Sequence, residues 1–305
     1  MTIFWQAVLS GLALGGIYGL VALGFNITYN TTKTLNFGQG EFLSLGALVG
    51  ASVLALLSAK GLTGVPDPAD VTLTRYLIAL GISVSILAGL GVLLYFIAIS
   101  PFAGKPGLSW VMSTIGFGIL IQNGAIAIWG LAPLAMPSPL GDDIIRVFGA
   151  GVRPQEIMVL VVMITIMVGL DLIMRRTKLG KALLAVAHNR QAASLMGINV
   201  TAMMVVAYVI GSSLAAVAGV LVAPIATASA FVGLTIALKA FAAAIVGGLS
   251  NPRGCILGGF LLGLLEALVG LWHAELREIS AFVLIIVALT FWPQGLLGRR
   301  LMEKV

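Results

Sequence analysis

The chain has 305 residues, of which 60% are hydrophobic and 9% charged, with a mean hydropathy of +1.11 and a net charge of +6. Soluble domains contain about 25% charged residues, so this composition indicates an integral membrane protein and excludes an ordinary soluble enzyme. The positive charge is no sign of nucleic-acid binding, because the basic residues lie in segments between apolar runs.

Nine apolar runs reach or approach the roughly 20 residues that cross a bilayer. The first lacks the basic segment that begins a signal peptide, so we expect it to be a span. The seventh is interrupted by Lys239 and ends at Gly247-Gly248, which predicts a broken or partly re-entrant helix. The runs cover residues 4–29, 41–59, 74–99, 108–132, 155–174, 202–226, 231–249, 254–272 and 279–297.

These runs predict an all-α, polytopic transmembrane helical bundle of about nine spans (eight to ten), in one domain over residues 1–305. Close packing between spans in lipid relies on small residues, since there is little hydrophobic drive between helices. Glycines recur every four residues in two of the runs, at Gly11, Gly15 and Gly19 and at Gly254, Gly258, Gly259 and Gly263.

One long polar segment, residues 175–200, separates the fifth and sixth runs. It holds Arg175, Arg176, Lys178, Lys181 and Arg190 and no acid. We expect a cytoplasmic helix here that docks a partner. Cytoplasmic loops are enriched in Lys and Arg, so this segment predicts an outer N-terminus and an inner C-terminus. The same orientation puts Lys33, Lys105, Arg253, Arg299, Arg300 and Lys304 inside, and Asp67, Asp70, Asp142, Asp143, Glu156, Glu275 and Glu278 outside.

Polar groups gather at the start of the second run, in Asn36, Gly38, Gln39, Gly40 and Glu41. Glycine-loosened backbone is tolerated at membrane depth only where it is buried in protein or lines a cavity. A helix that begins within the membrane also presents the positive end of its dipole, which suits an anionic group. We expect these residues to line the substrate path. The alternative is a plain loop with Glu41 in the first helical turn.

The region of Lys239, Gly247 and Gly248 is the second candidate for the path, and we expect Lys239–Gly248 to face Asn36–Glu41 across the centre of the bundle. An intramembrane lysine is costly unless it is paired or reaches the headgroups, and either outcome is open for Lys239. Glu266 lies deep in its run and needs a partner or a proton, and we expect it to support a neighbouring helix. Gln122 and Asn123 either line the path or hold helices together.

Catalytic motifs are missing from the sequence. There is no phosphate-binding G-x-x-x-x-G-K-[ST] loop and no H-E-x-x-H, and the histidines are His188 and His273. A single cysteine, Cys255, excludes an intrachain disulfide. We therefore expect a non-catalytic chain that binds no cofactor of its own.

Six segments in order resemble the permease subunits of branched-chain amino-acid ABC importers, the Liv-type high-affinity permeases. They are Leu35–Ala47 (LNFGQGEFLSLGA), Ser113–Asn123 (STIGFGILIQN), Leu179–Asn199 (LGKALLAVAHNRQAASLMGIN), Leu238–Gly259 (LKAFAAAIVGGLSNPRGCILGG), Glu266-Ala267 and Trp292–Gly298 (WPQGLLG).

The resemblance implies a coupling helix over Gly180–Gly197. Gln191, Ala192 and Ala193 followed by Gly197 resemble the E-A-A-x-x-x-G signature with which such permeases contact their ATPase, although Gln191 replaces the usual glutamate. We expect Ala192, Ala193 and Gly197 at that contact.

The resemblance also implies the partners: a homologous second permease, two ABC ATPase subunits that bind ATP and magnesium, and a periplasmic substrate-binding protein. Localisation would be the bacterial inner membrane. Substrates in the wider family include branched-chain amino acids, urea, short amides and aromatic or other organic acids. The alternatives are a ribose-type sugar permease, a membrane enzyme, and a channel or secondary transporter; the last should lack a docking helix.

Overall fold

The structure is a computed structural model that describes residues 2–102, 108–141, 143–147, 150–292 and 294–298. Within these ranges the chain is almost entirely helical. The α-helices are α1 (Thr2–Thr32), α2 (Gln39–Leu57), α3 (Leu73–Leu94), α4 (Ser109–Trp129), α5 (Pro154–Arg176), α6 (Lys178–His188), α7 (Arg190–Leu195), α8 (Val200–Ala226), α9 (Val232–Gly247), α10 (Pro252–Trp272) and α11 (Arg277–Phe291). Short 3-10 or π turns cover Pro68–Asp70, Tyr95–Ile99, Ser100–Phe102 and Ala274–Leu276, and strands β1 (Ile145–Val147) and β2 (Ala150–Val152) pair antiparallel.

Seven of the described helices are long and apolar enough to cross a membrane: α1, α2, α3 with its extension to Phe102, α4, α5, α8 and α10. The two remaining predicted runs are also helical, as α9 with 16 residues and α11 with 15. At about 1.5 Å per residue, α9 reaches only part of the way across a hydrocarbon core of about 30 Å. The prediction of an all-α polytopic membrane protein is confirmed.

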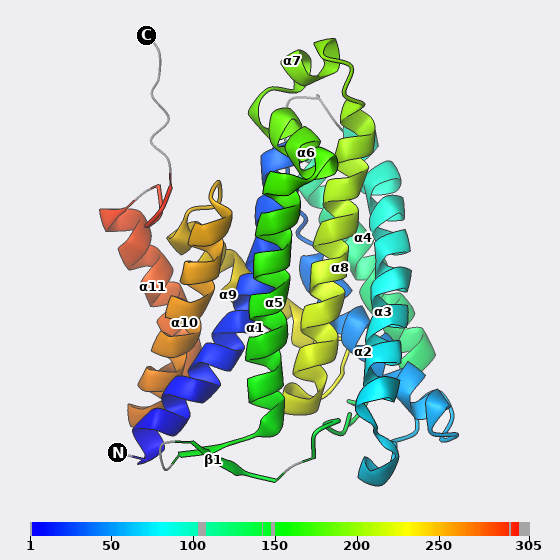
Figure 1. The fold of residues 1–305 in the computed structure, drawn as a ribbon, viewed down its shortest axis with the longest axis vertical. Helices are drawn as coiled ribbons and strands as arrows, with labels where there is room; N and C mark the ends of the chain where they lie inside the picture. Colours follow the sequence, from blue (N-terminus) through cyan, green and yellow to red (C-terminus); the bar gives the residue numbers. More distant parts are fainter. Residues whose placement is uncertain (1, 103–107, 142, 148–149, 293, 299–305) are drawn as a thin grey trace.

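Helices α1–α4 form one unit and helices α8–α11 form a second, and corresponding helices of the two units, such as α1 and α8, run in opposite directions (Figure 1). Helix α1 begins at the end of the bundle farthest from α6 and α7, whereas α8 begins beside them. The packing shows the same correspondence between the units. Helix α1 lies against α10 as α8 lies against α3, and α2 contacts its counterpart α9. This is the arrangement of an inverted-topology repeat. Helix α5 joins the two units and leads into α6 and α7.

The glycines of α1 and α10 meet at a close crossing of the two helices, as predicted for small residues in lipid. A methyl group on Gly15 would lie 2.8 Å from the backbone oxygen of Gly259, and one on Gly11 would lie 2.9 Å from that of Gly263. Gly258 of α10 similarly packs against the Ala243 backbone of α9. Side chains larger than hydrogen would therefore separate these helices.

Helices α2 and α9 both begin inside the bundle rather than at its ends. The Nε2 of Gln39, in the first turn of α2, donates to the backbone oxygen of Gly211, near the middle of α8. The first turn of α9 lies against that of α2, since a methyl group on Gly40 would be 2.7 Å from the Gly233 oxygen. Two helix starts therefore meet at mid-depth, one from each unit of the repeat.

Candidate translocation and coupling sites

Asn36 and Gln39 hold the start of α2 in place. Both are buried. The Nδ2 of Asn36 donates to Gln39 Oε1 over 3.1 Å, and its Oδ1 accepts from the Gly38 N–H over 3.0 Å. Gln39 continues the chain of bonds to Gly211 over 2.9 Å. The side-chain amides of Asn36 and Gln39 bond backbone groups around a non-helical stretch that is buried in protein. Non-helical backbone at membrane depth is tolerated only when it is buried in this way or lines a cavity.

Gly38 and Gly40 let two helices, α4 and α9, approach the start of α2. A methyl group on Gly38 would lie 3.1 Å from the Thr114 oxygen of α4. On the other side, Gly40 faces Gly233 of α9, whose N–H donates to the Ser44 hydroxyl over 2.8 Å. Ser44 of α2 thus supplies a bond to an N–H that the first turn of α9 would otherwise leave without an intrahelical partner.

The carboxylate of Glu41 lies against α4. A methyl group on Gly118 would lie 3.2 Å from Glu41 Oε2. This oxygen is shut off from solvent and has no hydrogen-bond partner among the described residues. A buried carboxylate oxygen without a partner is costly, so Glu41 is the one group of this cluster whose bonding the chain itself leaves incomplete.

Gln122 and Asn123 point to different surroundings. Gln122 is half-buried, and its Nε2 donates over 3.4 Å to the Ala230 oxygen in the loop that leads into α9. Asn123 is exposed and donates to the Ile119 oxygen of its own helix over 2.8 Å. Gln122 therefore connects α4 to the start of α9, whereas the hydrogen bond of Asn123 stays within α4.

Helix α9 faces the start of α2 through other residues than we expected. Phe241 packs against Phe37, with ring centroids 6.0 Å apart, and Ala237 lies beside Gly40. These residues and Gly233 recur every four positions on one face. Lys239 follows Ala237 by two residues, about 200° around the helix, so the expectation that Lys239 itself faces Asn36–Glu41 is corrected.

Lys239 belongs to a buried ionic cluster with Glu266, Arg277 and Tyr18. Its Nζ donates to Glu266 Oε1 over 2.8 Å, and Arg277 Nε donates to the same oxygen over 3.1 Å. The Tyr18 hydroxyl donates to Glu266 Oε2 over 2.7 Å. The side chains of Lys239 and Glu266 are 8% and 4% exposed. Lys239 is therefore paired rather than extended to the headgroups, and Glu266 joins α1, α9, α10 and α11.

Gly247 and Gly248 end α9 away from the start of α2. Gly247 packs on the backbone of Gly254, and Gly248 has φ of +100°, a value that favours glycine. The chain after α11 closes on this turn, with the Leu296 N–H bonded to the Val246 oxygen over 2.8 Å. These glycines shape the end of α9 and contact α10 and the residues that follow α11.

The segment between α5 and α8 forms two helices where we expected one over Gly180–Gly197. Thr177 caps α6 through a bond from the Gly180 N–H, and Asn189 caps α7 through a bond from the Ala192 N–H, each 3.0 Å. Asn189 adopts an extended backbone to make its cap, which breaks the helix. Gly197, with φ of +81°, forms the turn after α7, as expected of a glycine there.

Burial corrects which face of α7 is available to a partner. Ala193 is buried within the chain at 2% exposure, and Gly180 is packed against the end of α5. Ala192 is exposed, and the next turn presents Leu195 and Met196 at 90% and 82% exposure. Leu195 and Met196 stand together between Ser194 and Gly197 in the sequence, but the resemblance predicted a contact through the alanines instead.

Arg190 connects this segment to the end of α1. Its Nε donates to the Thr31 oxygen over 3.1 Å. Burial lowers the pKa of the nearby Lys33 from its usual value, and the positive charge of Arg190 lowers it further. Lys33 also has φ of +56°, in the left-handed region that a non-glycine residue rarely adopts. The residues between α1 and the cluster at Asn36–Glu41 are thus held in a constrained conformation beside α7.

Comparison with known proteins agrees with this architecture. The family described as "Branched-chain amino acid transport system / permease component" matches residues 7–289. The chain belongs to this family of permease components. BraD of Pseudomonas aeruginosa, a high-affinity branched-chain amino acid transport system permease protein, is 31% identical over 308 residues, covering 99% of this chain and 98% of BraD. LivH of Escherichia coli K12, described in the same words, is 30% identical with the same coverage.

Two further similarities are more distant. A probable branched-chain amino acid transport permease protein, LivH of Methanocaldococcus jannaschii, is 27% identical and is covered to 88%. Among solved structures, PsaBC from Streptococcus pneumoniae in complex with Fab aligns over 95% of this chain and 91% of that chain, with a TM-score of 0.45 and 12% identity. The family assignment rests on the permease components alone.

Proposed function

We propose that the chain is the transmembrane permease subunit of an ATP-driven importer of branched-chain amino acids or of related small amino acid, amide or organic acid substrates. The observation that carries this proposal is the full-length similarity to permease components whose names specify branched-chain amino acids. The same similarity favours this function over a ribose-type sugar permease, a membrane enzyme or a secondary transporter. The 305 residues act as one permease domain.

The proposed orientation places α6 and α7 in the cytoplasm of a bacterial cell whose inner membrane holds the chain. Helix α1 begins at the opposite end of the bundle, which puts the N-terminus outside and the end of α11 inside. The basic residues of α5 and α6 support this orientation through the positive-inside rule. Lys105, Arg299, Arg300, Lys304 and Asp142, which contributed to the same prediction, lie outside the described residues.

The proposed ATPase contact lies on α7, with Gln191, Ala192 and the exposed pair Leu195 and Met196. Exposed apolar residues at a polar end of the bundle support a protein partner there, since burial of such a pair favours association. Two ATPase subunits would bind ATP and magnesium, so that this chain is non-catalytic and holds no cofactor. A homologous second permease and a periplasmic binding protein complete the assembly.

The proposed path passes the meeting point of α2 and α9. Gly38, Gly40 and Glu41 lie at this point, and Asn36, Gln39 and Gln122 hold its walls through the bonds described above. Lys239, Gly247 and Gly248 support the path indirectly through α9. A path with few polar groups suits an importer, because tight binding of the substrate inside the membrane would slow its release.

The experiment that tests the substrate uses the importer reconstituted in proteoliposomes with its ATPase and binding-protein subunits. Uptake of labelled leucine, isoleucine, valine, urea, acetamide and ribose is measured with ATP inside the vesicles. We expect ATP-dependent uptake of the three amino acids. Uptake of urea or acetamide with none of leucine, isoleucine and valine would reassign the substrate, and uptake of ribose instead would refute the proposal.

A further inference from the structure

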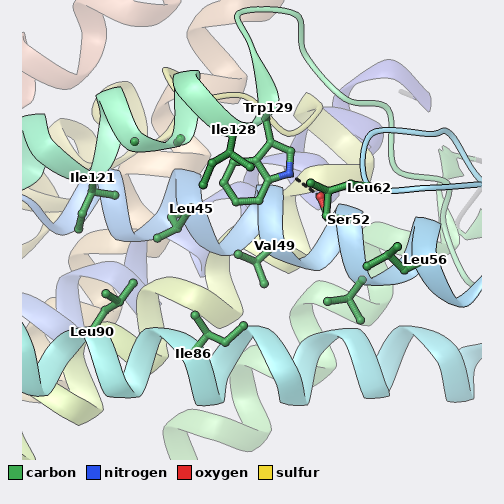
Figure 2. Close-up of a pocket in the computed structure, with 13 residues that line it drawn as sticks. Leu45, Val49, Ser52, Leu56, Leu62, Ile86, Leu90, Ile121, Ile128 and Trp129 are labelled. Atoms are coloured by element: carbon green, nitrogen blue, oxygen red, sulfur yellow. Dashed lines mark hydrogen bonds between the residues drawn. The ribbon is translucent and has the colours of Figure 1, made fainter.

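An apolar groove runs along α2 between α3 and α4, with a volume of about 450 Å³ (Figure 2). Leu45, Val49 and Leu56 of α2 form its floor, and Ile86 of α3 and Ile121 of α4 stand on its two sides. Its volume falls within the roughly 300–1,000 Å³ of small-molecule sites. The groove follows α2 from near its start at mid-depth to the end of the bundle where α1 also begins.

Glu41 lies just beyond the inner end of this groove and is not one of its lining residues. It precedes Leu45 by one helical turn, and its Oε2 lies against Gly118, which precedes Ile121 by about one turn of α4. Residues three or four apart share a helix face, so the stripe that forms the groove continues to the carboxylate. Its Oε2 is closed to solvent and has no hydrogen-bond partner among the described residues. At the other end, the Trp129 indole donates to Ser52 Oγ over 2.5 Å.

The inverted repeat shows that the fold does not require a carboxylate at this position. Gly40 packs against Gly233 and Ala237, and Gly233 packs against Gly40 and Ser44. This reciprocal contact aligns Gly40 with Gly233, so position 41 corresponds to Leu234 in the second unit. A leucine, half-exposed at 49%, thus stands where the first unit has its glutamate.

We propose that this groove is the substrate entry site of the permease and that Glu41 binds the ammonium group of the transported amino acid. The inference rests on the proposed function and assigns the polar recognition to one residue. A carboxylate at the end of an apolar trough is complementary to a primary ammonium joined to an aliphatic side chain. The aliphatic part lies along Leu45 and Val49, while the ammonium supplies the partner that Glu41 Oε2 lacks. Entry proceeds from the outer end of the groove toward the meeting point of α2 and α9.

The first test measures the charge at the groove without requiring transport. Leu45→Cys is introduced into the full chain in the assembled importer, where the native Cys255 is buried. Its rate of labelling is compared for cationic trimethylammonioethyl and anionic sulfonatoethyl methanethiosulfonate reagents added from outside. We expect the cationic reagent to react roughly tenfold faster, because a nearby carboxylate attracts it. The preference should disappear in Leu45→Cys with Glu41→Gln, and 10 mM leucine should slow labelling.

The second test measures recognition by uptake of labelled leucine. Glu41→Gln and Glu41→Leu should raise KM at least tenfold, and Glu41→Asp should restore part of the affinity. Glu41→Leu copies the residue of the second unit, so its assembly and thermal midpoint should stay near those of the unmodified chain. Val49→Trp should reduce uptake by narrowing the groove, whereas Ile164→Trp on an exposed face of α5 should not.

The outcomes separate this proposal from the proposed function. Equal labelling rates for both reagents, or an unchanged leucine KM in Glu41→Gln, would overturn the role of Glu41 while leaving an active importer. Labelling that leucine does not slow, with normal uptake in Val49→Trp, would show that lipid fills the groove and would also overturn it. Failure of the unmodified importer to take up any amino acid would instead refute the proposed function, and the labelling ratio would still report the charge.

Discussion

The Nε of Arg190 donates to the backbone oxygen of Thr31 over 3.1 Å, and this bond joins the first residue of α7 to the last turn of α1. Asn36, where the chain turns into the cluster that starts α2, follows Thr31 by only five positions. A movement of α7 against an ATPase would therefore reach the start of α2 through a short and constrained stretch of chain. This relationship gives a physical route from the coupling segment to the proposed path.

Arg190→Ala should weaken coupling. A hydrogen bond from a charged group contributes about 1.5–3 kcal/mol, so the number of leucine molecules transported per ATP should fall roughly tenfold while ATP hydrolysis continues. The measurement is simultaneous uptake and phosphate release in proteoliposomes. Arg176→Ala, at an exposed arginine near the end of α5, is the matched control. An unchanged transport ratio in Arg190→Ala would show that the link to Thr31 does not transmit movement.

Leu195→Asp should detach the ATPase. An aspartate at this 90% exposed position places a charge where we propose apolar contact, and burying an unpaired charge is unfavourable. Co-purification of the ATPase should fall at least tenfold, whereas Leu195→Met should retain it. A cross-linker at Ala192 should also reach the ATPase. If Leu195→Asp bound the ATPase normally and the cross-linker never reached it, the contact would lie elsewhere.

The ionic cluster predicts unequal effects of its members on stability. Removing one partner of a buried ion pair costs about 3–5 kcal/mol, because the other charge stays buried without compensation. Lys239→Met and Glu266→Gln should each lower the thermal unfolding midpoint in detergent strongly. Tyr18→Phe should lower it less, since it removes one hydrogen bond. Because the two residues share an interaction, Lys239→Met combined with Glu266→Gln should cost less than the sum of the two single losses; additive losses would argue against a working pair.

Gly233→Ala should disturb the meeting point of α2 and α9. Its new methyl group would lie 2.6 Å from Ser44 Oγ and closer still to the Gly40 oxygen. Overpacking of this kind costs about 1–3 kcal/mol. Gly81→Ala in α3 faces open space and should be neutral or stabilising, because alanine favours helix. The measurement compares the thermal unfolding midpoints of the two variants, and the midpoint of Gly233→Ala should be the lower one. Equal midpoints would mean that α2 and α9 separate easily.

Composition and hydropathy predicted the class of the protein and the seven described helices that are long enough to cross a membrane, because a bilayer imposes long apolar segments on any chain that crosses it. The glycine spacing of α1 and α10 also predicted a close crossing that the structure confirms. Motif resemblance gave the family. Local sequence determines these features.

Other features depend on contacts between distant segments and were missed. The sequence placed Lys239 beside Asn36–Glu41, but helix phase turns it toward Glu266, and no pattern in the chain indicated that Arg277 and Tyr18 share this partner. Ala193 was expected at the ATPase contact, yet the break at Asn189 turns it inward. The role of Gly233 emerges only from its contact with Gly40 and Ser44 of α2, the latter 189 residues earlier in the chain.

Leucine accumulation in proteoliposomes that contain the purified chain with or without its ATPase subunits distinguishes an ATP-driven importer from a secondary transporter. With the ATPases, the second permease, the binding protein and internal ATP, we expect accumulation against a concentration gradient. Without the ATPases, neither a sodium nor a proton gradient should drive it. Accumulation by the chain alone on an ion gradient would contradict the account.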